Sequence, residues 1–176
     1  GTNTFEFFDD FNDDTLDSDL WKGETSSFTE CNGYLYAGTT CDGSGYNDDR
    51  LSSNVTFTGN YIIESKVYMD YTSWGGFQAA GWRSNSSDGF GAGFYSYEDY
   101  YAVSYGEDVI GYNPSNNYAD NWVIVTVTAD GSSAKSSYYN VDDNHYYNIT
   151  RTQSGLSNGE IALGQWQCSC WETYSY

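Results

Sequence analysis

The sequence predicts an all-β fold, a two-sheet antiparallel β-sandwich, and three observations support this class. Turn-forming residues recur about every 8 to 12 positions, which is the spacing of short strands in a sandwich or barrel. No window keeps apolar residues at the i, i+3, i+4 and i+7 positions of an amphipathic helix. The 176 residues include 19 Tyr, 9 Phe and 6 Trp, far more aromatic side chains than a disordered acidic chain carries. Because this length is typical of one domain, we expect residues 1–176 to form a single β-sandwich domain.

About eleven strands are expected, a number that suits two packed sheets. The clearest are residues 121–128, which combine aromatic and β-branched residues, and residues 61–70, in which apolar and polar residues alternate. The other expected strands are residues 4–8, 34–37, 54–58, 76–83, 89–97, 100–106, 134–139, 145–151 and 161–167. Glycine and alanine inside two of these strands, residues 76–83 and 89–97, favour a curved sheet with a concave face.

The charge of the chain excludes two classes of partner. Lys and Arg number 6 against 25 Asp and Glu, which gives a net charge of −19. This field repels polyanions, so we expect neither nucleic acid nor an anionic membrane surface as a partner. The longest apolar runs, such as residues 122–125, fall far short of the roughly 20 residues that cross a bilayer, so no membrane span is expected.

Cysteine usage indicates the compartment. The four cysteines form an even set with three pairings, which the sequence leaves open: Cys31, Cys41, Cys168 and Cys170. A zinc site is disfavoured, because the last two cysteines are only two positions apart and the chain has one histidine. We therefore predict disulfides and an extracellular or cell-surface protein. In that setting three sequons become candidate glycosylation sites, at Asn54, Asn85 and Asn148.

The order of the segments resembles a known superfamily. The sequence FEFFDDFN at residues 5–12, followed by LDSDLW at residues 16–21, is similar to the first strand of concanavalin A-like lectin/glucanase domains, which include laminin G-like domains. The later segments follow the order of that family, at residues 32–36, 60–68, 80–83, 121–125 and 161–166. The resemblance implies a concanavalin A-like jelly roll. Such domains usually finish with one more strand, which residues 171–176 do not resemble, so we expect a sandwich that lacks its own final strand.

The acid pair of the related glucanases is not found. The resemblance implies Glu, Asp and Glu alternating on one strand, but here Glu64 is followed by Lys66, and Asp70 lies roughly 20 Å along the strand. Glycoside hydrolysis needs two carboxyl groups about 5 to 9.5 Å apart. We therefore predict that the protein is not an enzyme, and a glycoside hydrolase remains the last of three alternatives.

The aromatic residues favour carbohydrate binding, because flat rings stack on sugar C–H groups while polar side chains bind the hydroxyls. Alternation places Gln78, Ala80 and Trp82 on one face of their strand. The candidate carbohydrate-binding residues are Gln78, Trp82, Arg83, Tyr95, Tyr97, Gln165 and Trp166. The competing interpretation is that the tryptophans, including Trp122, fill the core between the sheets.

A calcium ion is the only cofactor that the sequence suggests. Asp10, Asn12 and Asp14 have the alternation that begins a calcium loop. The match then fails, because Thr15 and Trp21 stand where such a loop has Gly and Glu. Residues 142–144 are a second candidate. The alternative is a solvated loop in which Asp and Asn make turn hydrogen bonds.

The sequence thus favours an extracellular, non-catalytic domain that binds carbohydrate or acts in cell-surface adhesion. The alternative is a structural subunit that assembles into an extracellular filament or sheath by strand exchange, because few Lys residues protect its edge strands and we expect the final strand to be missing or disguised. The expected partner is accordingly a glycan or a neighbouring copy of the chain, as a homo-oligomer or a filament.

Overall fold

A computed structural model describes residues 6–37, 50–68, 76–83, 89–95, 99–104, 111–113, 121–130, 133–142, 144–152 and 158–166. The elements in chain order are β1 (Trp21–Gly23), the 3₁₀ turn η1 (Thr25–Ser27), β2 (Phe28–Cys31), β3 (Tyr34–Ala37), β4 (Arg50–Ser53), β5 (Phe57–Thr58), β6 (Tyr61–Tyr68), β7 (Gly76–Arg83), β8 (Gly89–Tyr95), β9 (Asp99–Ser104), β10 (Gly111–Asn113), β11 (Trp122–Ala129), β12 (Ser133–Asn140), β13 (His145–Thr152) and β14 (Asn158–Trp166). In these ranges no helix has the length and apolar character needed to cross a bilayer.

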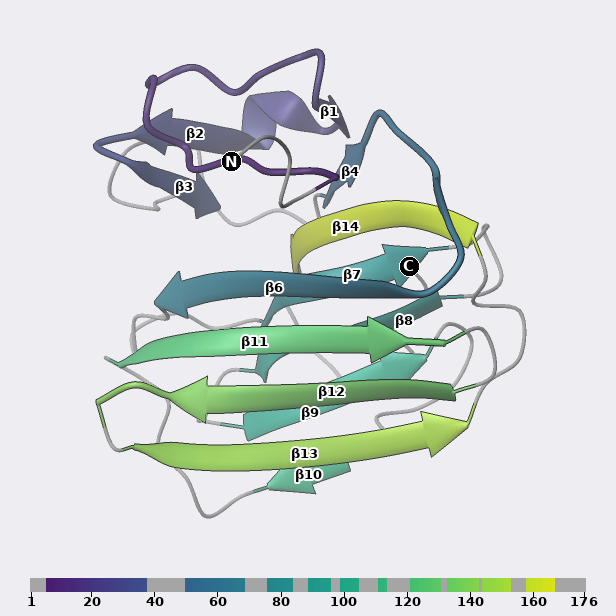
Figure 1. Cartoon of the computed structure of the whole chain (residues 1–176). Helices are drawn as coiled ribbons and strands as arrows, with labels where there is room; N and C mark the ends of the chain where they lie inside the picture. The colour runs from purple at the N-terminus through teal and green to yellow at the C-terminus, as the bar shows by residue number, and fades with distance from the viewer. Residues whose placement is uncertain are drawn as a thin grey trace.

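The strands form two facing layers and a small hairpin (Figure 1). The larger sheet has the order β1-β4-β14-β7-β8-β9-β10, with β5 also paired to β14, and the smaller sheet has the order β13-β12-β11-β6. Strands β2 and β3 pair with each other at the N-terminal end of the molecule. Because every strand pair in the described ranges is antiparallel, the predicted all-β, two-sheet sandwich is confirmed.

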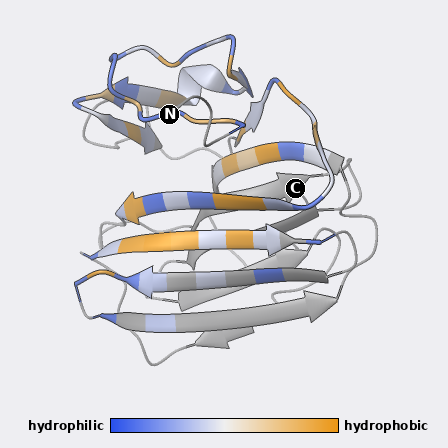
Figure 2. Cartoon of the chain, viewed as in Figure 1, coloured by the Kyte–Doolittle hydropathy of each residue, from blue (hydrophilic) through white to orange (hydrophobic). Residues whose placement is uncertain are grey.

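The smaller sheet buries one face of β11 and β6. Val123, Val125 and Val127 are at most 2% exposed, and they stand opposite the alternate residues of β6 that end in Ile63, which is 7% exposed. Figure 2 shows this concentration of hydrophobic residues along β11. The residues between the valines lie on the opposite face of the sheet, because successive side chains of a strand alternate. Trp122, the first residue of β11, therefore lies on this outer face of the sheet.

A second cluster holds the N-terminal segment against the larger sheet. Its buried members are Trp21, Phe28, Leu51 and Leu163, and six partly buried residues pack on them: Phe7, Phe11, Leu16, Leu20, Leu35 and Ile161. The predicted strand at residues 4–8 is wrong for its described part, since residues 6–8 form no strand. The Phe7 ring instead makes edge-to-face contacts with Trp21 at 5.1 Å and with Phe57 at 5.9 Å. The aromatic pattern of this segment therefore indicates rings that pack in the cluster, not a strand that pairs through its backbone.

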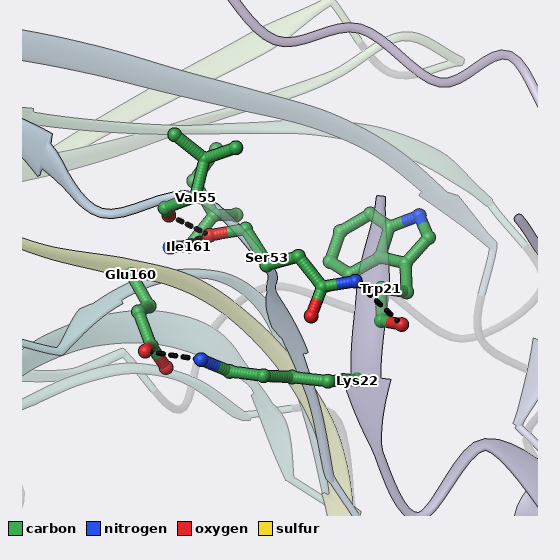
Figure 3. Close-up of polar contacts among 7 residues, drawn as sticks. Trp21, Lys22, Ser53, Val55, Glu160 and Ile161 are labelled. Atoms are coloured by element: carbon green, nitrogen blue, oxygen red, sulfur yellow. Dashed lines mark hydrogen bonds and ion pairs between the residues drawn. The ribbon is translucent and has the colours of Figure 1, made fainter. Parts of the chain in front are cut away.

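The join between β4 and β14 uses a side chain in place of a ladder bond. The described pairing ends at Ser52 opposite Ala162. Beyond it the Ser53 hydroxyl accepts a hydrogen bond from the Ile161 N–H at 3.0 Å and donates one to the Val55 carbonyl at 2.8 Å (Figure 3). Ser53 is completely buried, and its hydroxyl satisfies two backbone groups at this join.

An outer aromatic patch and the candidate site residues

Three aromatic rings meet on the outer face of the smaller sheet. Trp122 begins β11 directly opposite Tyr68 at the end of β6, and their ring centroids are 5.4 Å apart. Tyr34, from β3, stacks on Trp122 at 5.6 Å with 29° between the ring planes. Tyr34 and Tyr68 remain 47% and 48% exposed. The packing therefore fixes two rings while leaving about half of each accessible.

A lysine completes this group. The Lys66 ammonium lies 4.7 Å from the centre of the Trp122 ring, in a cation–π contact. We call Tyr34, Lys66, Tyr68 and Trp122 the outer aromatic patch. It combines flat apolar surface with hydrogen-bond donors, the combination that suits recognition of sugar C–H groups and hydroxyls.

The backbone under the patch is anchored from the β12–β13 turn. The Trp122 N–H donates to Asp142 Oδ2 at 2.9 Å, and the Val141 N–H donates to the Trp122 carbonyl at 2.9 Å. Asn140 Oδ1 in turn accepts from the Asp142 N–H at 3.0 Å. Since Asn140 is 2% exposed, this chain of bonds ties the start of β11 to the interior of the sheet.

Trp122 corrects an interpretation made from the sequence. Placing this tryptophan in the core is wrong, because it lies on the face opposite the buried valines and contacts two half-exposed tyrosines. The signal was present in the alternation of Val123, Val125 and Val127, which assigns the even-numbered positions to the other face. Tyr34 gave no comparable signal, because its contact joins strands far apart in the chain.

The carbohydrate-binding residues predicted from the sequence fall on three adjacent strands of the larger sheet but not at one place. Trp166 and Tyr95 both pair with Gly76, at the start of β7. Trp82 and Arg83 stand at the other end of β7, roughly 20 Å away at about 3.3 Å per residue. The six of these residues that the structure describes are therefore spread along β7 and its two neighbours rather than gathered at one point. Gln165 pairs with Phe77 next to Trp166, and Tyr97 lies outside the described residues.

A register shift also separates Gln78 from Trp82. Gln78 pairs with Gly93 of β8, whereas Ala80 pairs with Ala92, and a similar shift occurs against β14. Such a bulge interrupts the two-residue alternation of a strand. The assumption that Gln78, Ala80 and Trp82 follow one uninterrupted row is therefore wrong. Whether these residues bind carbohydrate stays a prediction.

The side chains of the predicted calcium ligands are hydrogen-bonded within the protein. Asp10 Oδ2 accepts from Asn12 Nδ2 at 2.7 Å, and Asp14 Oδ1 accepts from the Asn32 N–H at 2.8 Å. Within the described part of the chain no three His, Cys, Asp or Glu side chains are grouped to hold a metal ion. The turn bonds of the alternative interpretation are made by the neighbouring residues, since Asp9 Oδ1 accepts from the Phe11 N–H at 3.0 Å and Asp13 Oδ1 from the Thr15 N–H at 3.3 Å. Calcium binding stays a prediction, and part of the second candidate, residue 143, lies outside the described residues.

Cys31 ends β2, is 9% exposed and is disulfide-bonded. The pairing stays a prediction, because Cys41, Cys168 and Cys170 lie outside the described residues. Among the sequons, Asn85 also lies outside, and Asn148 stands in β13 opposite Ser137. Asn54 is exposed, but its side-chain amide donates to the Ser18 carbonyl at 2.7 Å and to the Trp21 carbonyl at 3.3 Å. Glycosylation at each sequon remains a prediction.

Comparisons with known proteins identify the fold. No known protein family and no curated protein matches the sequence. Among solved structures, the carbohydrate-binding module CBM66 from Bacillus subtilis is 14% identical, with 84% of this chain and 92% of the module covered and a TM-score of 0.61. Lectin II from Ulex europaeus is 10% identical, with 85% of each chain covered and a TM-score of 0.58. Basic winged bean lectin, solved with Tn-antigen, is 6% identical, with 84% of each chain covered and a TM-score of 0.59. The architecture and these likenesses together show that the chain has the concanavalin A-like jelly-roll fold that its sequence predicted.

Proposed function

We propose that this domain binds carbohydrate through the outer aromatic patch, in an extracellular setting, without hydrolysing its ligand. The observation that carries the proposal is the pair of half-exposed rings, Tyr34 and Tyr68, held against Trp122 with Lys66 beside them. Apolar side chains left in water cost free energy unless a ligand covers them, and the faces of sugars are suitable covers for aromatic rings. The ring contacts fix the geometry in advance, which lowers the entropic cost of binding.

The fold supports this proposal without carrying it. CBM66 is a carbohydrate-binding module, and the Ulex europaeus lectin has been solved with galactose. Because a fold hosts many functions, the argument depends on the patch. The disulfide-bonded Cys31 supports the extracellular setting.

The charges on the outer face support a non-catalytic role. Glu64 supplies the only carboxylate among the described outer-face side chains of β6, β11 and β12. The next alternate residue of β6 on that face is Lys66, which contacts Trp122. Acid-catalysed glycoside hydrolysis would need a second carboxyl group about 5 to 9.5 Å away. A lone Glu hydrogen-bonded by Thr126 at 3.5 Å does not supply that pair.

The test is a glycan array with plant, algal and microbial glycans, probed with the intact protein. We expect at least one hit, whose affinity falls about 10-fold, or roughly 1.4 kcal/mol, for Tyr34→Ala and for Tyr68→Ala. Ile62→Ala is the matched control, because Ile62 is 73% exposed on the same face of β6 and lies away from the patch. It should bind as the wild type does.

Two results would overturn the proposal. A blank array across all three glycan classes would remove carbohydrate binding. A hit that Trp82→Ala abolishes and that both tyrosine variants retain would move the site to the larger sheet. When the glycan identified on the array is incubated with the protein, analysis of reducing ends should show no cleavage.

A further inference from the structure

Resting on the proposed function, we infer that the ligand is a neutral, chain-like polysaccharide that lies across the strands of the smaller sheet, rather than a single terminal sugar. The inference comes from the aromatic residues that continue beyond the outer aromatic patch. Tyr139 and Tyr146 form a second ring pair on the outer face, with centroids 6.5 Å apart. Tyr146 is 58% exposed, and the Tyr139 hydroxyl donates to Asn144 Oδ1 at 3.0 Å.

The strand register places this second pair in line with the first. Ile124 stands directly opposite both Lys66 and Tyr139, and Tyr139 stands directly opposite Tyr146. One row of residues therefore crosses all four strands of the sheet, from Lys66 on β6 to Tyr146 on β13. The Tyr68–Trp122 pair lies beside this row, displaced by two residues along each strand. We call the row and the patch together the aromatic band: Tyr34, Lys66, Tyr68, Trp122, Ile124, Tyr139 and Tyr146.

The length of the band indicates an extended ligand. Neighbouring strands are about 4.8 Å apart, so β6 and β13 are separated by roughly 14 Å. The Tyr34 ring, from β3, stacks on Trp122 at 5.6 Å and so adds a third ring to the band beside the Tyr68–Trp122 pair. A single sugar covers one ring or two neighbouring rings. Only a chain of several sugars can cover Tyr34, Tyr68 and Tyr146 at once.

The charge of the band indicates a neutral chain. Lys66 is its only charged residue, and its ammonium is already in contact with the Trp122 ring. The whole protein carries a net charge of −19, so a polyanionic chain would be repelled at low ionic strength. A neutral polysaccharide matches a surface of rings and hydroxyls without that cost.

The test uses neutral insoluble polysaccharides, namely microcrystalline cellulose, chitin, β-1,3-glucan, xylan and mannan, each mixed with the full chain and separated by sedimentation. Oligosaccharides of one to six sugars, prepared from the polysaccharide with which the protein sediments, are then added as competitors. We expect affinity to rise with each added sugar up to about four or five. Tyr146→Ala should lose about 5-fold in affinity for the longest oligosaccharide and nothing for the disaccharide, whereas Tyr34→Ala should lose affinity for both. Circular dichroism checks folding, and Ile62→Ala again serves as the control.

The outcomes separate this inference from the proposed function. If the protein sediments with none of the polysaccharides and binds no oligosaccharide, carbohydrate binding itself is disproved. If a monosaccharide competes as well as the hexasaccharide and Tyr146→Ala binds normally, the domain binds carbohydrate but the chain-like ligand is wrong. If the protein bound polygalacturonate, an anionic polysaccharide, more strongly than every neutral polymer, the inference that the ligand is uncharged would be overturned. Concentration-dependent self-association that Tyr146→Ala abolishes would assign the band to contacts between copies.

Discussion

At the scale of single residues, Glu30 shows how folding can oppose ionisation. Its side chain lies in β2 and is buried, and Oε1 accepts a hydrogen bond from the Asp13 N–H at 3.2 Å. Burial raises the pKa of Glu30 above its ordinary value of 4.5, and the nearby carboxyl groups of Asp13 and Asp9 raise it further. The folded protein therefore holds this proton more tightly than the unfolded chain does.

We expect Glu30→Gln to stabilise the protein more at pH 7 than at pH 4. The amide oxygen can still accept from the Asp13 N–H, but no charge is buried. Because the folded pKa is raised, the cost of ionising Glu30 appears as pH rises through the ordinary value toward the raised one, and it is absent below both. Urea unfolding at the two pH values measures the difference. The exposed Glu6→Gln is the control, and an equal effect of Glu30→Gln at both pH values would contradict the prediction.

Asn54 shows that an exposed sequon can also have a structural role. A glycan on Nδ2 would replace one of the two hydrogens with which Asn54 binds the Ser18 and Trp21 carbonyls. We expect these bonds to compete with the modification, so that Asn54 carries no glycan when the protein is expressed in cells that glycosylate sequons. Thr56→Ala removes the sequon without changing the amide. Intact mass should then change only by the substitution, and the loss of a glycan mass would show that Asn54 is modified.

At the scale of elements, a short contact is not always a strong one. The Lys22 ammonium meets Glu160 Oε1 at 2.5 Å and links β1 to β14 across β4 (Figure 3). The two side chains are 46% and 28% exposed, so water screens the pair. The hydrogen bonds of the Ser53 hydroxyl to Ile161 of β14 and to Val55 are longer, but the Ser53 side chain is completely buried.

We therefore expect Ser53→Ala to destabilise the protein by about 1 to 3 kcal/mol, because the Ile161 N–H and the Val55 carbonyl lose a completely buried hydroxyl as their partner. Glu160→Gln should cost less than about 1 kcal/mol. Ser52→Ala is the control for removing a buried hydroxyl from the same strand. Denaturant unfolding ranks the three variants, and a larger loss for Glu160→Gln would contradict this order.

The sequence predicted some elements well and missed others for a physical reason. The bounds of β3 and β7 match the prediction, and β6, β11, β12 and β13 match within two residues over their described parts. The strands β1, β2, β4 and β10 were missed. In β4 the buried residues include Ser52 and Ser53, because pairing with β14 and β1 buries them whatever their polarity. Hydrophobic patterning cannot detect such a strand.

At the scale of the whole molecule, the order of segments along the chain predicted the fold, but the site depended on register. The Trp122–Tyr68 contact is set by how β11 pairs with β6, and the Trp122–Tyr34 contact by how the β2–β3 hairpin packs. A single sequence contains no record of these pairings. The expectations of a missing final strand and of assembly by strand exchange concern residues 171–176, outside the described part of the chain, and stay predictions.

The smaller sheet builds much of the aromatic band from one continuous stretch of chain. Strands β11, β12 and β13 follow one another as a meander, and their outer residues alternate with those that face the core. Replacing Ile124, Tyr139 or Tyr146 therefore leaves Val123, Val125 and Val127 in place. Randomising only these three outward positions should therefore leave the core of the sheet intact, which makes the meander a suitable target for directed evolution of binding.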